Sequence, residues 1–448
     1  MDFKTSKKYY NLCNPYEPLE PDDERNVDLD AFGEDTGALV RGFNWADKLE
    51  REIALADQPV FKLFTGHRGS GKTTELKRLI KQLSDQDGAN LFPVLIDAEN
   101  VIDVNSPIDV SDIISAVVYS TERAIIEKEG GPVDKAMNEG YLKRFWDWLC
   151  NTDIEIGKGN FTIPAAGKLV VELKNRPNLR QRIHNTVANH FSEFINEAKD
   201  ELKMLNSRVQ KKHGQSGIVI IFDSLEKLRG LKSNWHQVLE SAEQVFVGNE
   251  QHIQLPVHVL YTVPVAITTR SITTVDFLPM IKLRERNDEL YEPGIQAARE
   301  LIRQRVPDNI LEELLGSKME ERIHRLILQS GGYPREIIQM LQQAIVSTEY
   351  PLSDRAFEHI IKYIAGRYRM VVPEEAFSWL AKVAISKFLT VEDDIHRQIV
   401  DQMLLNHIVL SYLNDEPWFA LHPSVYQIPG VQKAINDLKK ETTDIIKG

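Results

Sequence analysis

The stretch "TGHRGSGKTTEL", residues 65–76, constrains the fold of this chain more than any other feature. It places a glycine four residues before Gly-Lys-Thr, it follows the apolar run "PVFKLF" (59–64), and apolar residues at helical spacing come after it. Strand, glycine-rich loop and helix, in that order, form the structure that binds phosphate groups. An ordinary glycine-rich turn before a helix is the minor alternative. The sequence therefore predicts an α/β core with a parallel sheet built around a P-loop.

The residues of this loop predict the contacts to a nucleotide. Its glycines let the backbone approach a phosphate closely, and the amides at the start of the helix face the β-phosphate. Lys72 is expected to reach the β- and γ-phosphates, and the Thr73 hydroxyl is expected to ligate Mg²⁺. The predicted cofactors are thus ATP and Mg²⁺. The predicted nucleotide-binding residues of the loop are Gly66, His67, Arg68, Gly69, Ser70, Gly71, Lys72, Thr73 and Thr74.

A second acidic element follows the apolar run in "GIVIIFDSLEKL" (217–228). A run this apolar is typical of a central parallel strand covered on both faces. Asp223 ends the run, at the edge of the sheet where ligands bind in open α/β folds. We therefore predict that Asp223 holds Mg²⁺ through water, beside the ligand Thr73, with a strand-terminal cap as the alternative role of Asp223. Glu226 is the candidate that orients or deprotonates the attacking water, with a solvated surface acid as the alternative.

Further apolar runs predict the remaining strands of the sheet. Thr262 ends one of them, where its hydroxyl could touch the γ-phosphate or the attacking water, or could simply be a strand-end threonine. Asp97, Glu99 and Asp103 follow another, and we interpret them as an acidic loop in preference to a metal cluster. The predicted strands lie within residues 91–101, 256–264 and 277–283.

These motifs together resemble the AAA+ and STAND branch of P-loop NTPases, especially its initiator-like and KAP-like members. The similar parts are the lead-in "LVRGFNWADKLEREI" (39–53), the P-loop, "IIFDSLEKL", "HVLYTVP" and "SGGYPREIIQML" (330–341). The resemblance implies that Arg41 and Gly42 lie beside the base. It also implies that Pro334 matches the STAND Gly-x-Pro proline, and that Arg335 is the sensor-2 arginine, which bridges from a mobile lid to the γ-phosphate. A plain turn and helix start is the alternative for the last motif.

Two departures from the family pattern change the expectation. Typical AAA+ enzymes carry glutamate directly after the strand-ending aspartate, whereas this chain has Ser224. Slow hydrolysis in a switch is therefore expected instead of a fast motor. The P-loop and Asp223 are also about 150 residues apart, which indicates a helical insertion near 129–214. We expect one long helix from 177 to about 209. Near its start Lys174, Arg176, Arg180 and Arg182 form a basic cluster. We interpret it as a solvated face in preference to an arginine finger for a neighbouring subunit or a site for an acidic partner.

The pattern beyond the core predicts two further parts. Helical periodicity fills residues 291–370, which we interpret as a helical lid. Helices followed by "HIVLSYL", the turn "NDEP" and "WFALHP" resemble a winged-helix domain at 371–448. The full predicted organisation is an N-terminal segment at 1–38, a P-loop ATPase domain at 39–290, the lid, and the winged-helix-like domain.

The charge of the last domain predicts its partner. Its turn carries Asp415 and Glu416, and a preceding helix carries Glu392, Asp393 and Asp394, which would repel phosphate. We expect Tyr412, Trp418 and Phe419 on the same surface, where they would suit a protein partner.

The whole chain points to a switch in the cytoplasm. Its net charge of −12 argues against a surface that grips nucleic acid throughout, and no apolar run reaches the roughly 18 residues of a membrane span. We expect ATP-dependent self-assembly into a homo-oligomer, or control of a separate effector protein, in bacterial defence or stress signalling. The alternative is an ATP-dependent DNA-binding initiator or loader; a small-molecule kinase is disfavoured.

Overall fold

The computed structural model divides the chain into two compact units, each assembled from separate stretches of sequence. The lid unit comprises residues 1–45, 66–77 and 278–448, and the sheet unit comprises 46–65 and 78–277. The P-loop thus belongs to the same unit as the lid and the C-terminal region. The structure describes residues 1–33, 39–133, 141–152, 177–228, 230, 233–270, 275–391 and 393–447.

A five-stranded sheet forms the centre of the sheet unit, in the order β2-β3-β4-β1-β5. The register pairs Asp97 with Asp223 and Phe64 with Thr262 in parallel strands, so the carboxyl ends of β1 to β4 share one edge. This confirms the predicted α/β fold with a parallel P-loop sheet. The strand predicted at 277–283 begins earlier and ends at Leu278. The strands are β1 Phe61–Gly66, β2 Leu91–Asp97, β3 Gly217–Asp223, β4 His258–Thr262 and β5 Val275–Leu278.

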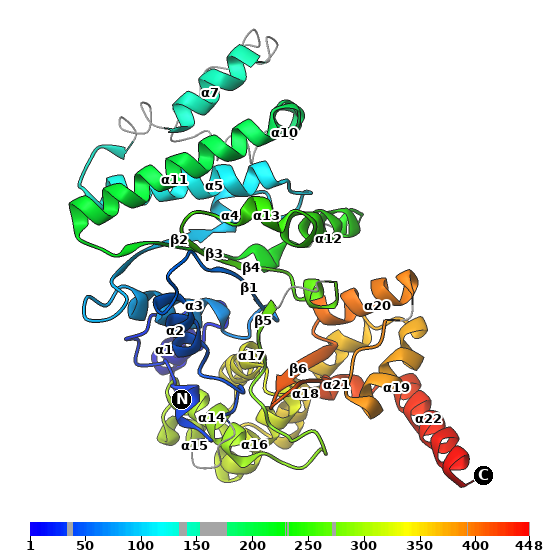
Figure 1. The fold of residues 1–448 in the computed structure, drawn as a ribbon. Coiled ribbons are helices and arrows are strands. Elements are labelled where there is room, and N and C mark those ends of the chain that lie inside the picture. Colours follow the sequence, from blue (N-terminus) through cyan, green and yellow to red (C-terminus); the bar gives the residue numbers. More distant parts are fainter. Residues whose placement is uncertain are drawn as a thin grey trace. The chain divides into compact units, whose positions relative to one another are not determined.

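Helices cover both faces of this sheet (Figure 1). α5 (Val110–Lys128) and α11 (Phe191–His213) lie on one face, and α2 (Trp45–Ala54) lies on the other. Burying both faces explains why β3 is apolar along its length. The other helices of the unit are α4 Ala98–Val101, α7 Tyr141–Thr152, α10 Pro177–Asn189, α12 Trp235–Glu243 and α13 Glu250–Ile253, while α3 Lys72–Leu83 starts in the lid unit.

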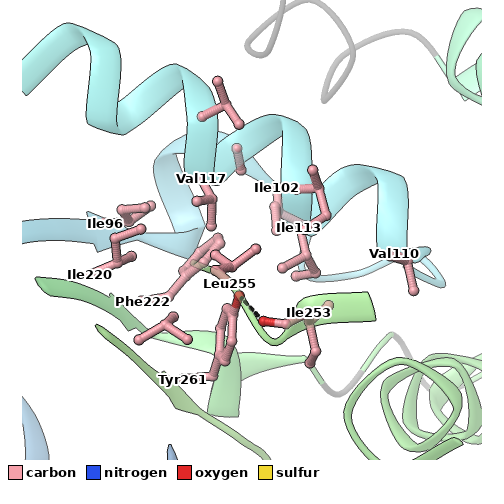
Figure 2. Packing of buried hydrophobic residues seen from close by; sticks show 14 of the residues in the cluster. Ile96, Ile102, Val110, Ile113, Val117, Ile220, Phe222, Ile253, Leu255 and Tyr261 are labelled. Atoms are coloured by element: carbon pink, nitrogen blue, oxygen red, sulfur yellow. Dashed lines mark hydrogen bonds between the residues drawn. The ribbon is translucent and has the colours of Figure 1, made fainter. Parts of the chain in front are cut away.

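The core of the sheet unit lies between α5 and the sheet (Figure 2). Ile113 and Val117 of α5 point toward Phe222 of β3, and all three side chains are buried. Tyr261 of β4 lies in the same core, where its hydroxyl donates a hydrogen bond of 3.1 Å to the Ile253 carbonyl oxygen. That bond satisfies the one polar atom of a fully buried ring.

The insertion differs from its prediction in two respects. The expected single helix is two, because the chain leaves helical geometry at His190 between α10 and α11. Arg180, expected on a solvated face, is buried and its Nη2 lies 2.7 Å from an Asp112 carboxylate oxygen. A buried arginine needs such a partner, which the cluster's sequence did not reveal. Lys174 and Arg176 lie outside the described residues.

Helices make up most of the lid unit. α1 (Phe3–Leu12) packs against α17 (Pro334–Ile345), so the N-terminal segment lies on the lid. The antiparallel hairpin of β6 (Val409–Leu413) and β7 (Pro417–Leu421) pairs Ser411 with Phe419 and confirms the predicted wing. The remaining helices are α14 Glu292–Arg303, α15 Asp308–Leu315, α16 Met319–Ser330, α18 Asp354–Arg369, α19 Phe377–Ser386, α20 Asp394–Leu405, α21 Pro423–Tyr426 and α22 Pro429–Lys447.

The aromatic residues of the wing correct one expectation. Tyr412 and Trp418 are buried and stack with their ring centroids 4.5 Å apart. They cluster with Met280, Tyr333 and Leu410, so they belong to the interior of the lid unit and not to a partner surface. The hairpin alternates its two faces, and burial of one face accounts for this pair.

The charges of the wing region follow the prediction where the structure describes them. Asp415 and Glu416 are exposed at the hairpin turn, and Phe419 is half-buried. Asp393 caps α20, since its Oδ1 accepts a hydrogen bond of 2.8 Å from the His396 amide, and Asp394 is the first residue of that helix. Glu392 lies outside the described residues. No helix in the described ranges is long and apolar enough to cross a membrane.

Candidate nucleotide-binding site

The P-loop joins the end of β1 to the start of α3 at Lys72. Gly69 and Gly71 have φ of +87° and +101°, a left-handed backbone that side chains with a Cβ rarely adopt. Ser70 is buried within the loop, and Thr73 is the second residue of α3. The loop therefore has the glycine-dependent shape that a phosphate cradle needs.

Lys72 is held inside this loop. Its Nζ donates hydrogen bonds to the carbonyl oxygens of Gly66 at 2.8 Å and His67 at 3.1 Å, and the side chain is buried. A buried ammonium group needs such acceptors. The charge is thereby placed within the loop whose amides are predicted to bind phosphate, so the residues present fit an ATP phosphate chain.

Arg41 contacts the loop from the lead-in segment. Its Nη2 donates a hydrogen bond of 2.6 Å to the Ser70 carbonyl oxygen, and its Nη1 lies 3.6 Å from a Glu75 carboxylate oxygen. Burial lowers the pKa of the Arg41 guanidinium, and the charge of Glu75 opposes that shift. Gly42 has φ of +76°, and a Cβ there would lie 2.7 Å from the Leu413 side chain. The predicted position of both residues beside the base stays a prediction.

The lid motif reaches the P-loop directly. Pro334 is the first residue of α17, where its missing N–H costs nothing. The Arg335 side chain lies against Gly69, its Nε donates a 3.1 Å hydrogen bond to the Pro15 carbonyl oxygen, and its guanidinium carbon is 5.3 Å from the centre of the Tyr16 ring. The structure thus places the Arg335 side chain against the P-loop, and the roles that the resemblance implied for Pro334 and Arg335 stay predictions.

The lid and the C-terminal region meet on one backbone atom of the loop. The Arg68 carbonyl oxygen accepts a 2.8 Å hydrogen bond from the Tyr333 hydroxyl and a 3.0 Å hydrogen bond from His407 Nε2. The rings of Tyr333 and His407 stack with centroids 4.9 Å apart. His407 was not predicted, because nothing in "LLNHIVL" marks its histidine as a loop contact.

His67 makes a second contact to the C-terminal region. Its Nδ1 lies 3.2 Å from the Leu404 carbonyl oxygen, and since a carbonyl only accepts, Nδ1 carries the proton. Burial, together with the charge of Lys72, lowers the pKa of His67 to about 3. Burial, together with His67, lowers the pKa of His407 well below its usual value. Both rings are therefore neutral at pH 7.

The N-terminal segment also contacts the start of α3, which the sequence did not predict. The Leu19 amide donates a 3.3 Å hydrogen bond to Thr74 Oγ1. Lys77 Nζ lies 2.6 Å from a Glu20 carboxylate oxygen. With Pro15 on Arg335, this segment ties the P-loop helix to the lid.

The predicted acids lie in the sheet unit. Asp223 is buried at the end of β3, and Ser224 after it adopts a left-handed conformation with φ of +67°. Thr262 Oγ1 accepts a 3.0 Å hydrogen bond from the Leu225 amide and donates a 3.3 Å hydrogen bond to the Phe222 carbonyl oxygen. Thr262 thus fixes the turn that carries both acids. Glu226 lies partly buried in the short helix Leu225–Lys227.

The other acids at this edge have local partners. Asp97 Oδ1 accepts a 3.1 Å hydrogen bond from the Glu99 amide, Glu99 pairs with Lys227, and Asp103 accepts a 2.6 Å hydrogen bond from the Ser106 hydroxyl. Among the described residues, no group of three or more acidic, histidine or cysteine side chains is placed to hold a metal ion. Asp97, Glu99 and Asp103 are thus each hydrogen-bonded or ion-paired to another residue of the chain.

The predicted site residues therefore divide between the two units. Residues 66–74, with Arg41, Gly42, Pro334 and Arg335, fall in the lid unit; Asp223, Glu226 and Thr262 fall in the sheet unit. The strand register gathers the carboxyl ends of β1, β3 and β4 at one edge, where the P-loop begins and Asp223 and Thr262 lie. The parts of the predicted site are thus described within each unit, and their assembly around a nucleotide stays a prediction.

Comparison with known proteins found similar solved structures. No family model and no curated protein matches the chain. The structure of ORC2 from Aeropyrum pernix in its ADPNP-ADP complexes is similar to this chain, with 12% sequence identity and a TM-score of 0.33. The match covers 88% of this chain and 93% of that chain. Its ADP form has 12% identity over 95% and 97%, with a TM-score of 0.38. CDC6P from Pyrobaculum aerophilum has 9% identity over 95% and 98%, with a TM-score of 0.35.

Proposed function

We propose that this chain binds ATP with Mg²⁺, hydrolyses it slowly, and acts as a nucleotide-dependent switch. One observation carries the proposal. The P-loop backbone is hydrogen-bonded at Arg68 both by the lid, through Tyr333, and by the C-terminal region, through His407. A loop that adjusts to its nucleotide therefore acts on both parts at once.

The residues divide the work as follows. The amides of residues 66–74 bind the phosphates, and Lys72 supplies the positive charge beside them. Thr73 and Asp223 would hold Mg²⁺, which would neutralise charge on the phosphates. Arg335, in the first turn of α17, reaches the γ-phosphate. Its side chain already lies against Gly69 of the P-loop. Glu226 orients or deprotonates the attacking water.

Slow turnover follows from the turn after β3. The position next to Asp223 holds Ser224, whose short side chain is no general base. Glu226 must then act from the following short helix, and Thr262 keeps that turn in place through the Leu225 amide. Thr262 acts as a positioning residue in this scheme.

ATP shifts the population only between states that bind it differently. Contacts from Arg335 and His407 to the loop make such states differ in the lid and the C-terminal region. The exposed Asp415 and Glu416 favour a protein partner there, either a second copy of the chain or a separate effector.

An ATP-dependent DNA-binding initiator or loader is the second candidate. The sequence resemblance includes initiator-like members, and the similar solved structures are named ORC2 and CDC6P. On those similarities this candidate stands ahead of a role in bacterial defence or stress signalling, which the STAND resemblance alone suggested.

Two measurements test the proposal. Calorimetry should show ATP binding to the full chain, its loss in Lys72→Ala, and its retention in Lys81→Ala, a control in the same helix. Equal affinity in wild type and Lys72→Ala would refute the P-loop assignment. Titration of duplex DNA across a salt series separates the candidates, since submicromolar binding at physiological salt that disappears on deleting the residues after Val371 supports the initiator.

A further inference from the structure

A cavity of about 370 Å³ lies within the lid unit, away from the P-loop residues. Its walls come from three places: the end of α16 at Leu328 and Gly331, the loop at Leu283–Asp288, and the C-terminal region from Ala384 to Lys439. Small-molecule sites are typically about 300–1,000 Å³, mostly apolar, and formed where several elements meet. The cavity is thus large enough for a small organic molecule.

Aromatic side chains form one wall of the cavity. Tyr412 and Trp418, which line it, are the stacked pair of the hairpin. The Tyr412 hydroxyl donates a 2.6 Å hydrogen bond to the Gly331 carbonyl oxygen, and Trp418 Nε1 donates a 3.3 Å hydrogen bond to Asn414 Oδ1. Because both polar atoms are bonded within the protein, this wall offers carbon surface, which suits a planar apolar ring.

The exposed side of the lining, which we call the mouth, has a net positive charge, because Arg284 and Lys439 outnumber Asp288 there. Arg284 and Lys439 line it and are exposed, while Asp288, the acid beside them, is paired at 2.7 Å with the buried ammonium of Lys387. Within the described part of the chain, one hydrogen bond is recorded for the Arg284 guanidinium, from Nη1 to the Asp288 carbonyl oxygen at 2.8 Å. A guanidinium has five N–H donors, so it can still bind a carboxylate or phosphate.

A hydroxyl completes the polar side. Tyr426 lines the cavity and is half-buried. Burial, with the nearby charge of Asp288, raises the pKa of Tyr426 to about 12, so its phenol keeps the proton and can donate a hydrogen bond. Apolar wall, cationic mouth and a hydroxyl donor together select for one ligand class.

We propose that this cavity binds a small aromatic anion, a planar ring bearing a carboxylate or phosphate. The ring lies on the Tyr412 and Trp418 wall, and the anionic group meets Arg284 at the mouth. No residue of the P-loop lines this cavity, so its binding can be tested separately from the nucleotide switch.

Two probes test the site on the full chain by calorimetry. 2-Naphthoate and 1-naphthyl phosphate carry the ring with the two anionic groups, and uncharged 2-naphthamide is the control ligand. We expect saturable 1:1 binding of at least one anion and weaker binding of the amide. The anion with the higher affinity shows whether the site prefers a carboxylate or a phosphate. Repeating the titration with Lys72→Ala should give the same affinity, which separates this site from the nucleotide site.

Variants locate the binding. Arg284→Gln should weaken the anion about tenfold or more, as expected for loss of a charged hydrogen bond. Arg286→Gln is the matched control, because Arg286 is on the same loop but stacks on Phe388, outside the cavity. Ala420→Leu should fill the cavity and abolish binding; if it fails to fold, the surface change at Arg284 decides alone. Binding of neither probe, equal binding of the amide, or equal losses in the two arginine variants would overturn the proposal.

Discussion

Gly69 of the P-loop and Arg335 of the lid occupy adjoining space: a Cβ at Gly69 would lie 2.6 Å from Arg335 Nε. A side chain at position 69 would displace Arg335 from its place. The arginine that the sequence linked to the γ-phosphate therefore lies on the phosphate-binding loop itself.

This contact predicts the effect of Gly69→Ala. The methyl group would push Arg335 away, and the left-handed backbone alone costs about 1–2 kcal/mol with a Cβ. We expect a lower unfolding midpoint and weaker ATP binding. Gly366→Ala is the control: Gly366 lies inside α18 with nothing within 4 Å of its Cβ position, so alanine there should be neutral or stabilising. Equal effects of the two changes would show that the Arg335 contact is unimportant.

Arg335→Ala should bind ADP nearly as wild type does, yet lose the preference for ATP. Its predicted partner is the γ-phosphate, the group by which the two nucleotides differ. Calorimetry with ADP and a non-hydrolysable ATP analogue measures this preference. Arg325→Ala is the control, because Arg325 lies on the lid surface, where it pairs with Glu358. A variant that keeps the ATP preference would leave Arg335 only its contacts to Pro15 and Tyr16.

The parts of this fold that are marked by a local sequence pattern were predictable from the sequence. Apolar runs that stop at Asp97 and Asp223 mark strands because both faces of the sheet are buried. The hairpin was predictable because its two apolar runs flank "NDEP". Such signals need only residues close in sequence, and so does the glycine pattern of the P-loop.

The parts that depend on distant contacts were not predictable. His407 bonds to Arg68 across 339 residues of sequence, and no local pattern encodes that pair. Burial of Tyr412 and Trp418 depends on Met280 and Tyr333 packing over them, so the hairpin alone suggested exposure. The break at His190 likewise interrupts an otherwise continuous helical periodicity.

The two acids of the sheet unit should separate by their kinetics. Glu226→Gln keeps the size of the side chain but removes its charge, so we expect unchanged ATP–Mg²⁺ binding and turnover at least about 100-fold slower, as for loss of general-base catalysis. Asp223→Asn should instead weaken the dependence on Mg²⁺. Steady-state hydrolysis at several Mg²⁺ concentrations distinguishes them, and wild-type turnover in Glu226→Gln would assign the base elsewhere.

The buried histidines predict a pH dependence of stability. His67 and His407 have folded pKa values below the ordinary value near 6.5, so unfolding lets them take up protons below that pH. Their stabilising contribution is complete above pH 6.5 and is lost as the pH falls from there toward about 3, the folded pKa of His67.

His407→Gln tests this linkage. Each neutral histidine steepens the loss of unfolding free energy by up to about 1.4 kcal/mol per pH unit below 6.5. The glutamine amide can still donate to the Arg68 carbonyl oxygen but does not titrate, so the variant should lose stability less steeply between pH 6.5 and pH 5. Urea unfolding across that range measures the slope. His359→Gln, at an exposed position in α18, should keep the wild-type slope; if His407→Gln keeps it too, His407 does not couple protonation to the contact between the C-terminal region and the P-loop.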